Sequence, residues 1–285
     1  MKPAPFVYHA PKTLGDALAN LAEFGPQDGR VLAGGQSLIP MMAFRMARPA
    51  HLIDINTVAG LDRLAVEGDM LSVGACVRHA AFHRPVVEGP TGTLLSRVVR
   101  DIAHYPIRLR GTFCGSLAHA DPASEWCLAA VTLGAEIIAM SRRGRRVMAA
   151  DDFFEGMMAT ALAEDELLLE ARLPLLSPET HFGFYEFSRR AGDYALAMAL
   201  VTFRLQDGVI VAPRIGIGGA EARPRRMAAA EAVLAGRRPD PESFRAAAEA
   251  AADAVEPMED IHADAEFRFD LVRAVTRRAL ERAHA

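Results

Sequence analysis

The 285-residue sequence has little of what marks secreted or nucleic-acid-binding proteins. Its three cysteines, Cys76, Cys114 and Cys127, form no C-x-x-C pair. An odd, unpatterned set argues against a disulfide framework and against an iron–sulfur cluster with four cysteine ligands from this chain alone. It fits a reducing compartment. Aromatic residues make up 7% of the chain, with one tryptophan, so a surface that stacks nucleic-acid bases is not expected.

The sequence also lacks an excess of one charge and any long apolar run. Its formal net charge is −4 at pH 7, which gives no reason to expect binding to nucleic acid or to an anionic membrane. No stretch approaches the 18 or so apolar residues of a transmembrane helix. Residues 1–11 hold three prolines and no apolar core, unlike a signal peptide. These absences predict a cytoplasmic protein without a membrane span.

Periodicity along the chain predicts an α+β protein of more than one domain. Helical spacing after Thr13 and apolar strands at 31–33 and 52–55 indicate a small α/β unit over residues 1–57. Hairpins and helices over residues 58–176 form a second subdomain of the same domain, 1–176. Residues 177–285 are expected to form a smaller domain with an antiparallel sheet, from runs at 182–187, 195–205 and 209–218, followed by helices.

Three segments are less regular. Val77–Phe82 is predicted to begin a helical run that continues over 93–102. Residues 128–134 fit a short helix or a strand. The arginine-rich run 142–146 is interpreted as a solvated hairpin turn, with a basic docking patch as the alternative.

A glycine pair follows the first predicted strand. The stretch reads Ala33-Gly34-Gly35-Gln36-Ser37-Leu38-Ile39-Pro40. Glycine permits positive φ and close approach of a ligand to the main chain. Successive backbone N–H groups in such a turn form a concavity for phosphate oxygens, to which the Ser37 hydroxyl adds a donor. The alternative is an ordinary strand–turn–helix junction.

A second stretch of small residues lies at 107–125. It is predicted to be a turn rich in glycine and hydroxyls, and it contains Thr112, Cys114, Gly115, Ser116 and Ala118 before the carboxylates Asp121 and Glu125. Two main-chain cradles suit the two phosphates of a dinucleotide, and nearby carboxylates can accept hydrogen bonds from its hydroxyls. The alternative for Asp121 is a turn or cap residue before Pro122. Neither stretch is a Rossmann or P-loop fingerprint.

Together these stretches resemble the FAD-binding medium subunit of molybdenum hydroxylases, the carbon monoxide dehydrogenase and xanthine dehydrogenase family. Its two pyrophosphate motifs are AGGHSL or AGGQSL and T-x-GGS, and the similarity extends over essentially the whole chain. The resemblance implies an FAD-binding domain of two subdomains, of the PCMH/vanillyl-alcohol-oxidase-like type, followed by the C-terminal flavoprotein domain. It implies non-covalent FAD bound by residues of both motifs, Ala33, Gly34, Gly35, Gln36, Ser37, Leu38, Thr112, Cys114, Gly115, Ser116, Ala118, Asp121 and Glu125.

Two further segments match the family. Asp165-Glu166-Leu167-Leu168 resembles the segment whose backbone lies against the flavin ring, so Leu167 and Leu168 are implied to contact it. Tyr194, in Arg189-Arg190-Ala191-Gly192-Asp193-Tyr194, stands where a side chain covers one face of the ring, and would shield it by stacking. The alternative for Tyr194 is a tyrosine on a half-buried strand.

Two positions depart from the family pattern. Cys114 replaces the first glycine of T-x-GGS, which disfavours positive φ there and adds a thiol near the phosphates. Leu109 replaces a frequent asparagine. Both bear on how tightly FAD is bound.

The resemblance implies that the chain takes electrons from 2Fe–2S clusters on a small subunit and passes them from FAD to an external acceptor. A large subunit would carry molybdopterin, in a dimer of heterotrimers. No catalytic residue is assigned in this chain, because FAD carries the redox chemistry. His104 and His119 are interpreted as structural, and Asp54, His79 and His83 as too scattered for a metal site. The alternatives are a stand-alone FAD-dependent reductase and an FAD-less scaffold subunit.

Overall fold

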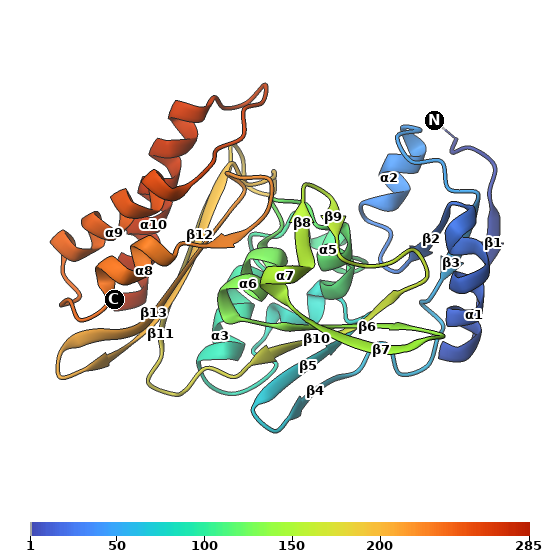
Figure 1. Ribbon diagram of the computed structural model, residues 1–285, viewed down its shortest axis with the longest axis horizontal. Helices are drawn as coiled ribbons and strands as arrows, with labels where there is room; N and C mark the ends of the chain where they lie inside the picture. Colours follow the sequence, from blue (N-terminus) through green and yellow to red (C-terminus); the bar gives the residue numbers. More distant parts are fainter. Residues whose placement is uncertain (1) are drawn as a thin grey trace.

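A computed structural model describes residues 2–285 of the chain and shows three sheets with helices arranged along one long axis (Figure 1). A fourth, two-stranded sheet pairs β8 (Phe154–Gly156) with β9 (Ala159–Thr160). The α+β prediction is confirmed. None of the helices formed by residues 2–285 has the length and apolar character needed to span a bilayer.

The first unit is a parallel sheet of order β1-β3-β2 at one end of the molecule (Figure 1). Its strands are β1 (Val7–His9), β2 (Gly29–Leu32) and β3 (His51–Asp54). Helix α1 (Leu14–Phe24) begins at Thr13, whose hydroxyl accepts a hydrogen bond from the Asp16 N–H as a helix cap does. The buried face of α1 packs with Ile53 and Ile55. A 3₁₀ turn, η1 (Gly25–Gln27), leads into β2, and α2 (Leu38–Ala43) follows it.

The middle unit is an antiparallel sheet of order β4-β5-β10-β6-β7. These strands are β4 (Leu64–Glu67), β5 (Met70–Gly74), β6 (Glu136–Ser141), β7 (Gly144–Ala149) and β10 (Leu167–Pro174). Its helices are η2 (His79–His83), α3 (Pro90–Val98), α4 (Tyr105–Arg108), α5 (Phe113–His119), α6 (Glu125–Leu133) and α7 (Ala150–Phe153). Every residue of α6 is buried, including the polar Glu125 and Thr132, and its other residues are apolar, as expected for a helix packed on all sides.

The third unit is an antiparallel sheet of order β11-β12-β13-β14. Its strands are β11 (His181–Phe187), β12 (Ala197–Gln206), β13 (Val209–Gly218) and β14 (Arg225–Arg226). Helices α8 (Ala228–Leu234), α9 (Pro241–Ala254) and α10 (Ala265–His284) cover one side of it (Figure 1). The other side faces the middle unit, because Met198 and Leu200 of β12 belong to the same apolar cluster as Leu128 of α6.

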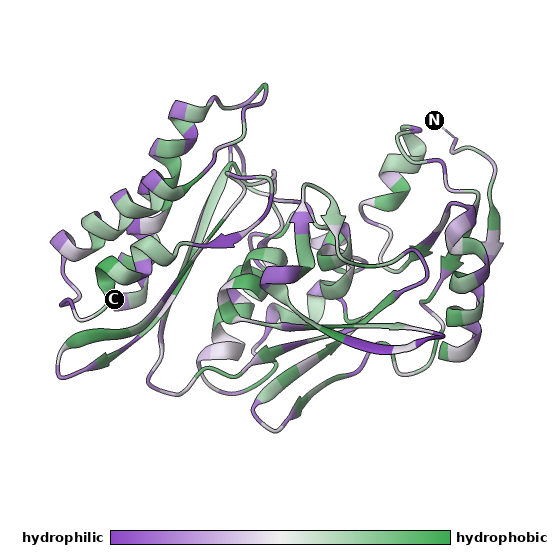
Figure 2. Cartoon of the chain, viewed as in Figure 1, coloured by the Kyte–Doolittle hydropathy of each residue, from purple (hydrophilic) through white to green (hydrophobic). Residues whose placement is uncertain are grey.

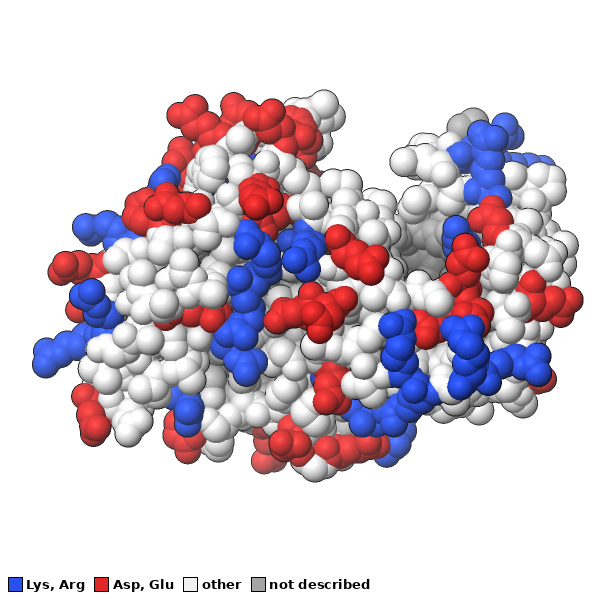
Figure 3. Space-filling model, viewed as in Figure 1, with Lys and Arg blue, Asp and Glu red and all other residues white. Residues whose placement is uncertain are grey.

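Hydropathy follows this layering (Figure 2). The strands that face helices are mostly hydrophobic, whereas the edge strand β7 is largely exposed and is hydrophilic at the end that carries its arginines. Charged side chains on an edge strand discourage pairing with another chain. Figure 3 shows charged residues over much of this face of the molecule, and a hollow between the part that carries α2 and the middle unit.

The structure corrects two predictions made from the sequence and, at a third segment, chooses between helix and strand. The run from Val77 to residue 102 is not one continuous helical segment, because η2 and α3 are separated by a stretch that contains Pro85 and ends at Gly89, with φ 89°. Residues 128–134 belong to helix α6, which ends at Gly134 in the left-handed conformation, and not to a strand. The small-residue stretch at 112–119 is not a turn but the start and body of α5.

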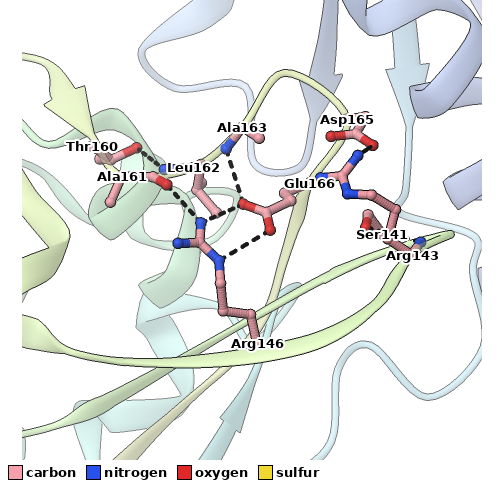
Figure 4. Close-up of polar contacts among 9 residues, drawn as sticks. All are labelled: Ser141, Arg143, Arg146, Thr160, Ala161, Leu162, Ala163, Asp165 and Glu166. Carbon is pink, nitrogen blue, oxygen red and sulfur yellow. Dashed lines mark hydrogen bonds and ion pairs between the residues drawn. The ribbon is translucent and has the colours of Figure 1, made fainter.

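The hairpin at the arginine run is confirmed, and three of its arginines pair with carboxylates of the chain: Arg145 with Glu170 at 3.8 Å, and the two drawn in Figure 4. Arg143 pairs with Asp165, and Arg146 makes two hydrogen bonds with Glu166, at 2.6 and 3.1 Å. Arg146 also donates to the Ala161 carbonyl. These contacts fix the segment that leads into β10.

Candidate functional site

The first glycine loop connects β2 to α2. Gly35 adopts φ 72°, a conformation that L side chains rarely adopt, and so the chain can turn sharply after the strand. The Gln36 side-chain amide donates to the Gly34 carbonyl at 3.1 Å, and the Ile39 N–H donates to the Gly35 carbonyl at 3.0 Å. These local bonds hold Ser37 and Leu38 at the start of α2.

The second stretch is organised by a helix cap. The Thr112 hydroxyl accepts a hydrogen bond from the Gly115 N–H at 3.0 Å, which fixes the first turn of α5. Cys114 lies inside this helix, so the position does not require positive φ. Its thiol is fully buried and donates to the Val73 carbonyl at 3.3 Å. The expectation of a thiol near the phosphates is therefore wrong, because the side chain faces the core.

The two loops are in direct contact. A Cβ atom on Gly34 would lie 2.5 Å from the Arg110 carbonyl oxygen and 2.6 Å from the Gly111 Cα. A network of side chains holds the contact: Asn56 donates to the Ala33 carbonyl at 2.7 Å, and Arg78 donates to Asn56 at 2.6 Å and to the Arg110 carbonyl. Only glycine at position 34 allows backbones to approach so closely.

A groove of two adjoining cavities runs beside the loops. One, of about 250 Å³, is lined by residues 30–38 and by Gly111, Thr112, Gly115 and Ala118. The other, of about 200 Å³, is lined by Asp121, Glu125 and Tyr194 among others. Five residues line both: Gln36, Ser37, His79, Ser116 and His119. Except for Cys114, the predicted residues of both motifs thus lie along one groove, together with Asp121, Glu125 and Tyr194.

The end of the groove at Tyr194 combines an aromatic ring with carboxyl groups. Tyr194 is 72% exposed, so its ring is free to stack on a ligand. Asp121 accepts a hydrogen bond from the Ala123 N–H, so it also serves as a turn residue, as the alternative proposed. Burial raises the pKa of Glu125 and of Glu186, and nearby negative charges raise both further, those of Asp101 and Asp121 at Glu125 and those of Glu125 and Asp101 at Glu186. This environment therefore favours the protonated, uncharged form of both carboxyls over two charges.

Leu167 and Leu168 are placed differently from the other predicted residues. Both have buried side chains in β10, and neither lines the cavities beside the two loops. Their contact with a ligand stays a prediction.

Four residues that contribute to the groove were not predicted as site residues. Gly111 meets Gly34, and Asn56 and Arg78 form the network behind the contact. His79 lines both cavities, whereas no role was predicted for it, because Asp54, His79 and His83 are too scattered in the sequence to suggest a metal site. Within residues 2–285, no group of three or more His, Cys, Asp or Glu side chains could hold a metal ion. Of these residues, only Gly111 had a signal in the sequence, because it directly precedes Thr112 of the second motif.

The groove fits FAD in its chemical layout. Its middle is lined by hydrogen-bond donors from both loops, which suits a diphosphate. One end carries carboxyl groups that can accept hydrogen bonds from hydroxyls, and an exposed tyrosine that can stack on a planar ring. A side chain at position 34 would collide with the backbone of the second loop, so the contact between the loops requires glycine there.

Comparison with known families gives two matches. A family model described as the FAD binding domain in molybdopterin dehydrogenase matches residues 4–176. A second, described as the CO dehydrogenase flavoprotein C-terminal domain, matches residues 182–283.

Individual proteins are similar over the full chain. The nicotine 6-hydroxylase medium subunit of Paenarthrobacter nicotinovorans is 40% identical, over 100% of this chain and 99% of that protein. The caffeine dehydrogenase subunit beta of Pseudomonas sp. strain CBB1 is 39% identical, over 99% and 96%. Among solved structures, a chain of carbon monoxide dehydrogenase from Hydrogenophaga pseudoflava superposes with a TM-score of 0.95 at 36% identity, over 100% of this chain and 99% of that one. A chain of quinoline 2-oxidoreductase from Pseudomonas putida 86 gives 0.92 at 37%, with the same coverage.

Proposed function

Because the chain belongs to the family of FAD-binding medium subunits of molybdenum hydroxylases, we propose that it carries electrons between a partner's 2Fe–2S clusters and an external acceptor. FAD supplies the redox chemistry when bound, and the chain binds it, orients it and limits the access of water. The observation that carries the proposal is the groove formed where the two glycine loops meet.

Each part of the groove has a proposed role toward FAD. Residues 33–38 of the first loop, with Thr112, Gly115, Ser116 and Ala118 of the second, cradle the diphosphate. Asp121 and Glu125 accept hydrogen bonds from the hydroxyls of the cofactor. Tyr194 stacks on one face of the isoalloxazine ring. Cys114 contributes through the helix that presents Gly115, since its own thiol points into the core.

The partners follow from the family. We propose a large subunit that holds molybdopterin and a small subunit that holds the clusters, assembled as a dimer of heterotrimers in the cytoplasm. The relatives are named for nicotine, caffeine and carbon monoxide, yet the matched subunits are each 34–40% identical to this chain, so we assign the choice of substrate to the large subunit. The domain division at residues 176 and 177 is part of the same proposal, and it is supported by the two separate family matches.

The first test is a visible absorption spectrum of the purified chain, before and after acid or heat treatment. A flavin spectrum whose chromophore is released and identified as FAD is the expected result. A colourless chain that takes up no added FAD would contradict the proposal. Turnover of a pyridine nucleotide and an organic substrate by the chain alone would instead indicate a stand-alone reductase.

A further inference from the structure

His79 lies at the centre of the groove, at the start of η2. It is 4% exposed, and its backbone N–H donates to the Gly111 carbonyl at 3.0 Å. Its ring packs directly against Gly111, where an added Cβ would lie 2.5 Å from the ring Nε2. It is one of the five residues that line both cavities. The ring thus lies at the point where the two glycine loops and the two cavities meet.

Trp126 determines which ring nitrogen of His79 carries the proton. The indole Nε1 of Trp126 lies 2.9 Å from Nδ1 of His79. An indole N–H can only donate, so Nδ1 must accept, and the proton of the neutral ring must be on Nε2. Trp126 is itself fully buried against Phe82 and Phe113, with ring centroids at 5.1 and 4.9 Å. The donor that fixes the tautomer is therefore held by the core.

The ring also stays uncharged. Burial, with the guanidinium groups of Arg108 and Arg78, lowers the pKa of His79 to about 4. An imidazolium would moreover turn an N–H at Nδ1 toward the N–H of Trp126. Near neutral pH His79 is therefore a single N–H donor at Nε2, and its Nδ1 is not available to a metal ion.

The residues around His79 indicate what accepts this hydrogen bond. The other four residues shared by the two cavities, Gln36, Ser37, Ser116 and His119, can all donate hydrogen bonds, and none is a carboxylate. The carboxyl groups of Asp121 and Glu125 line only the cavity at Tyr194. The middle of the groove therefore suits the part of a ligand that has many acceptors and no donors, which in a dinucleotide is the diphosphate.

We propose that His79 binds the FAD diphosphate by donating from Nε2 to a phosphate oxygen, and that Trp126 acts as the positioning residue that keeps the ring in this tautomer. The proposal rests on the proposed function, because it takes FAD as the occupant of the groove. It adds a side chain from outside both glycine motifs to the phosphate site.

The test is FAD binding by the full chain, after removal of bound flavin, followed by the change in flavin fluorescence. A hydrogen bond to a charged group is worth about 10- to 100-fold in affinity, so His79→Leu should raise the dissociation constant by that factor. His79→Gln, which keeps an amide N–H at a reach similar to that of Nε2, should recover most of the loss. Phe153→Leu is the matched control, because Phe153 belongs to the same apolar cluster but neither lines the groove nor stacks on Trp126.

Competition with smaller ligands locates the contact. ADP and adenosine are each titrated against bound FAD. His79→Leu should raise the dissociation constant of ADP by the same factor as that of FAD, and it should leave the dissociation constant of adenosine unchanged. Nitrogen-15 NMR of labelled wild-type chain should show His79 protonated at Nε2 alone, and Trp126→Phe should remove that preference.

The outcomes separate this inference from the proposed function. A wild-type chain that binds no FAD overturns both. A wild-type chain that binds FAD with the same dissociation constant as His79→Leu overturns the role of His79 only. An equal loss for ADP and adenosine, or a wild-type ring protonated at Nδ1, also overturns it.

Discussion

Gly34→Ala is expected to weaken FAD binding by forcing the two glycine loops apart. The added Cβ would meet the Arg110 carbonyl oxygen at 2.5 Å and the Gly111 Cα at 2.6 Å, and both are backbone atoms that no rotamer change can move. Gly34 is not among the residues with positive φ, so the cost comes from this collision and not from backbone strain. Overpacking of this kind costs about 1–3 kcal/mol.

The free chain can relieve this cost by separating the loops, but FAD binding requires them to return. The penalty then falls on binding, and about 1–3 kcal/mol corresponds to about a 5- to 150-fold higher dissociation constant. The assay is titration of the flavin-free chain with FAD, followed by fluorescence. Gly156→Ala is the matched control, because a Cβ there meets nothing within 4 Å. Equal FAD affinity in Gly34→Ala, Gly156→Ala and wild type would refute the argument.

Three further predictions concern the same site. Gly115→Val should purify without flavin absorbance but with a wild-type circular dichroism spectrum, because its Cβ would meet the Thr112 hydroxyl at 2.5 Å; retained flavin would contradict this. Thr112→Ala should lose about 1 kcal/mol of unfolding free energy in urea through loss of the α5 cap, whereas Thr112→Ser should keep most of it; equal losses would argue against a capping role. In wild type, the unfolding free energy should fall as pH rises above 4.5, because the unfolded chain ionises Glu125 and Glu186 while burial raises their pKa values in the folded chain. Glu186→Gln should make this fall shallower between pH 5 and 8 in urea titrations, and an unchanged slope would show that the pair does not hold the proton.

The sequence predicted most elements that have a strong local signal. Helix α1 was recognised from its spacing and from the Thr13 cap, and the hairpin between β12 and β13 from Asp207-Gly208. Short elements were missed, such as β14, whose two residues carry no periodic pattern. The α5 segment was predicted as a turn, because glycine and serine are typical of turns while the cap formed by Thr112 depends on geometry.

The sequence by itself determined three things: the two glycine motifs, the lack of the four cysteines that would ligate an iron–sulfur cluster in this chain, and the resemblance to the family. These depend only on residue type and order. Only the tertiary structure decided that Gly34 touches Gly111, that the Cys114 thiol faces the core and that Trp126 sets the tautomer of His79. These contacts join residues 41 to 77 positions apart. Packing brings them together, and no local pattern in the chain encodes the distance between them.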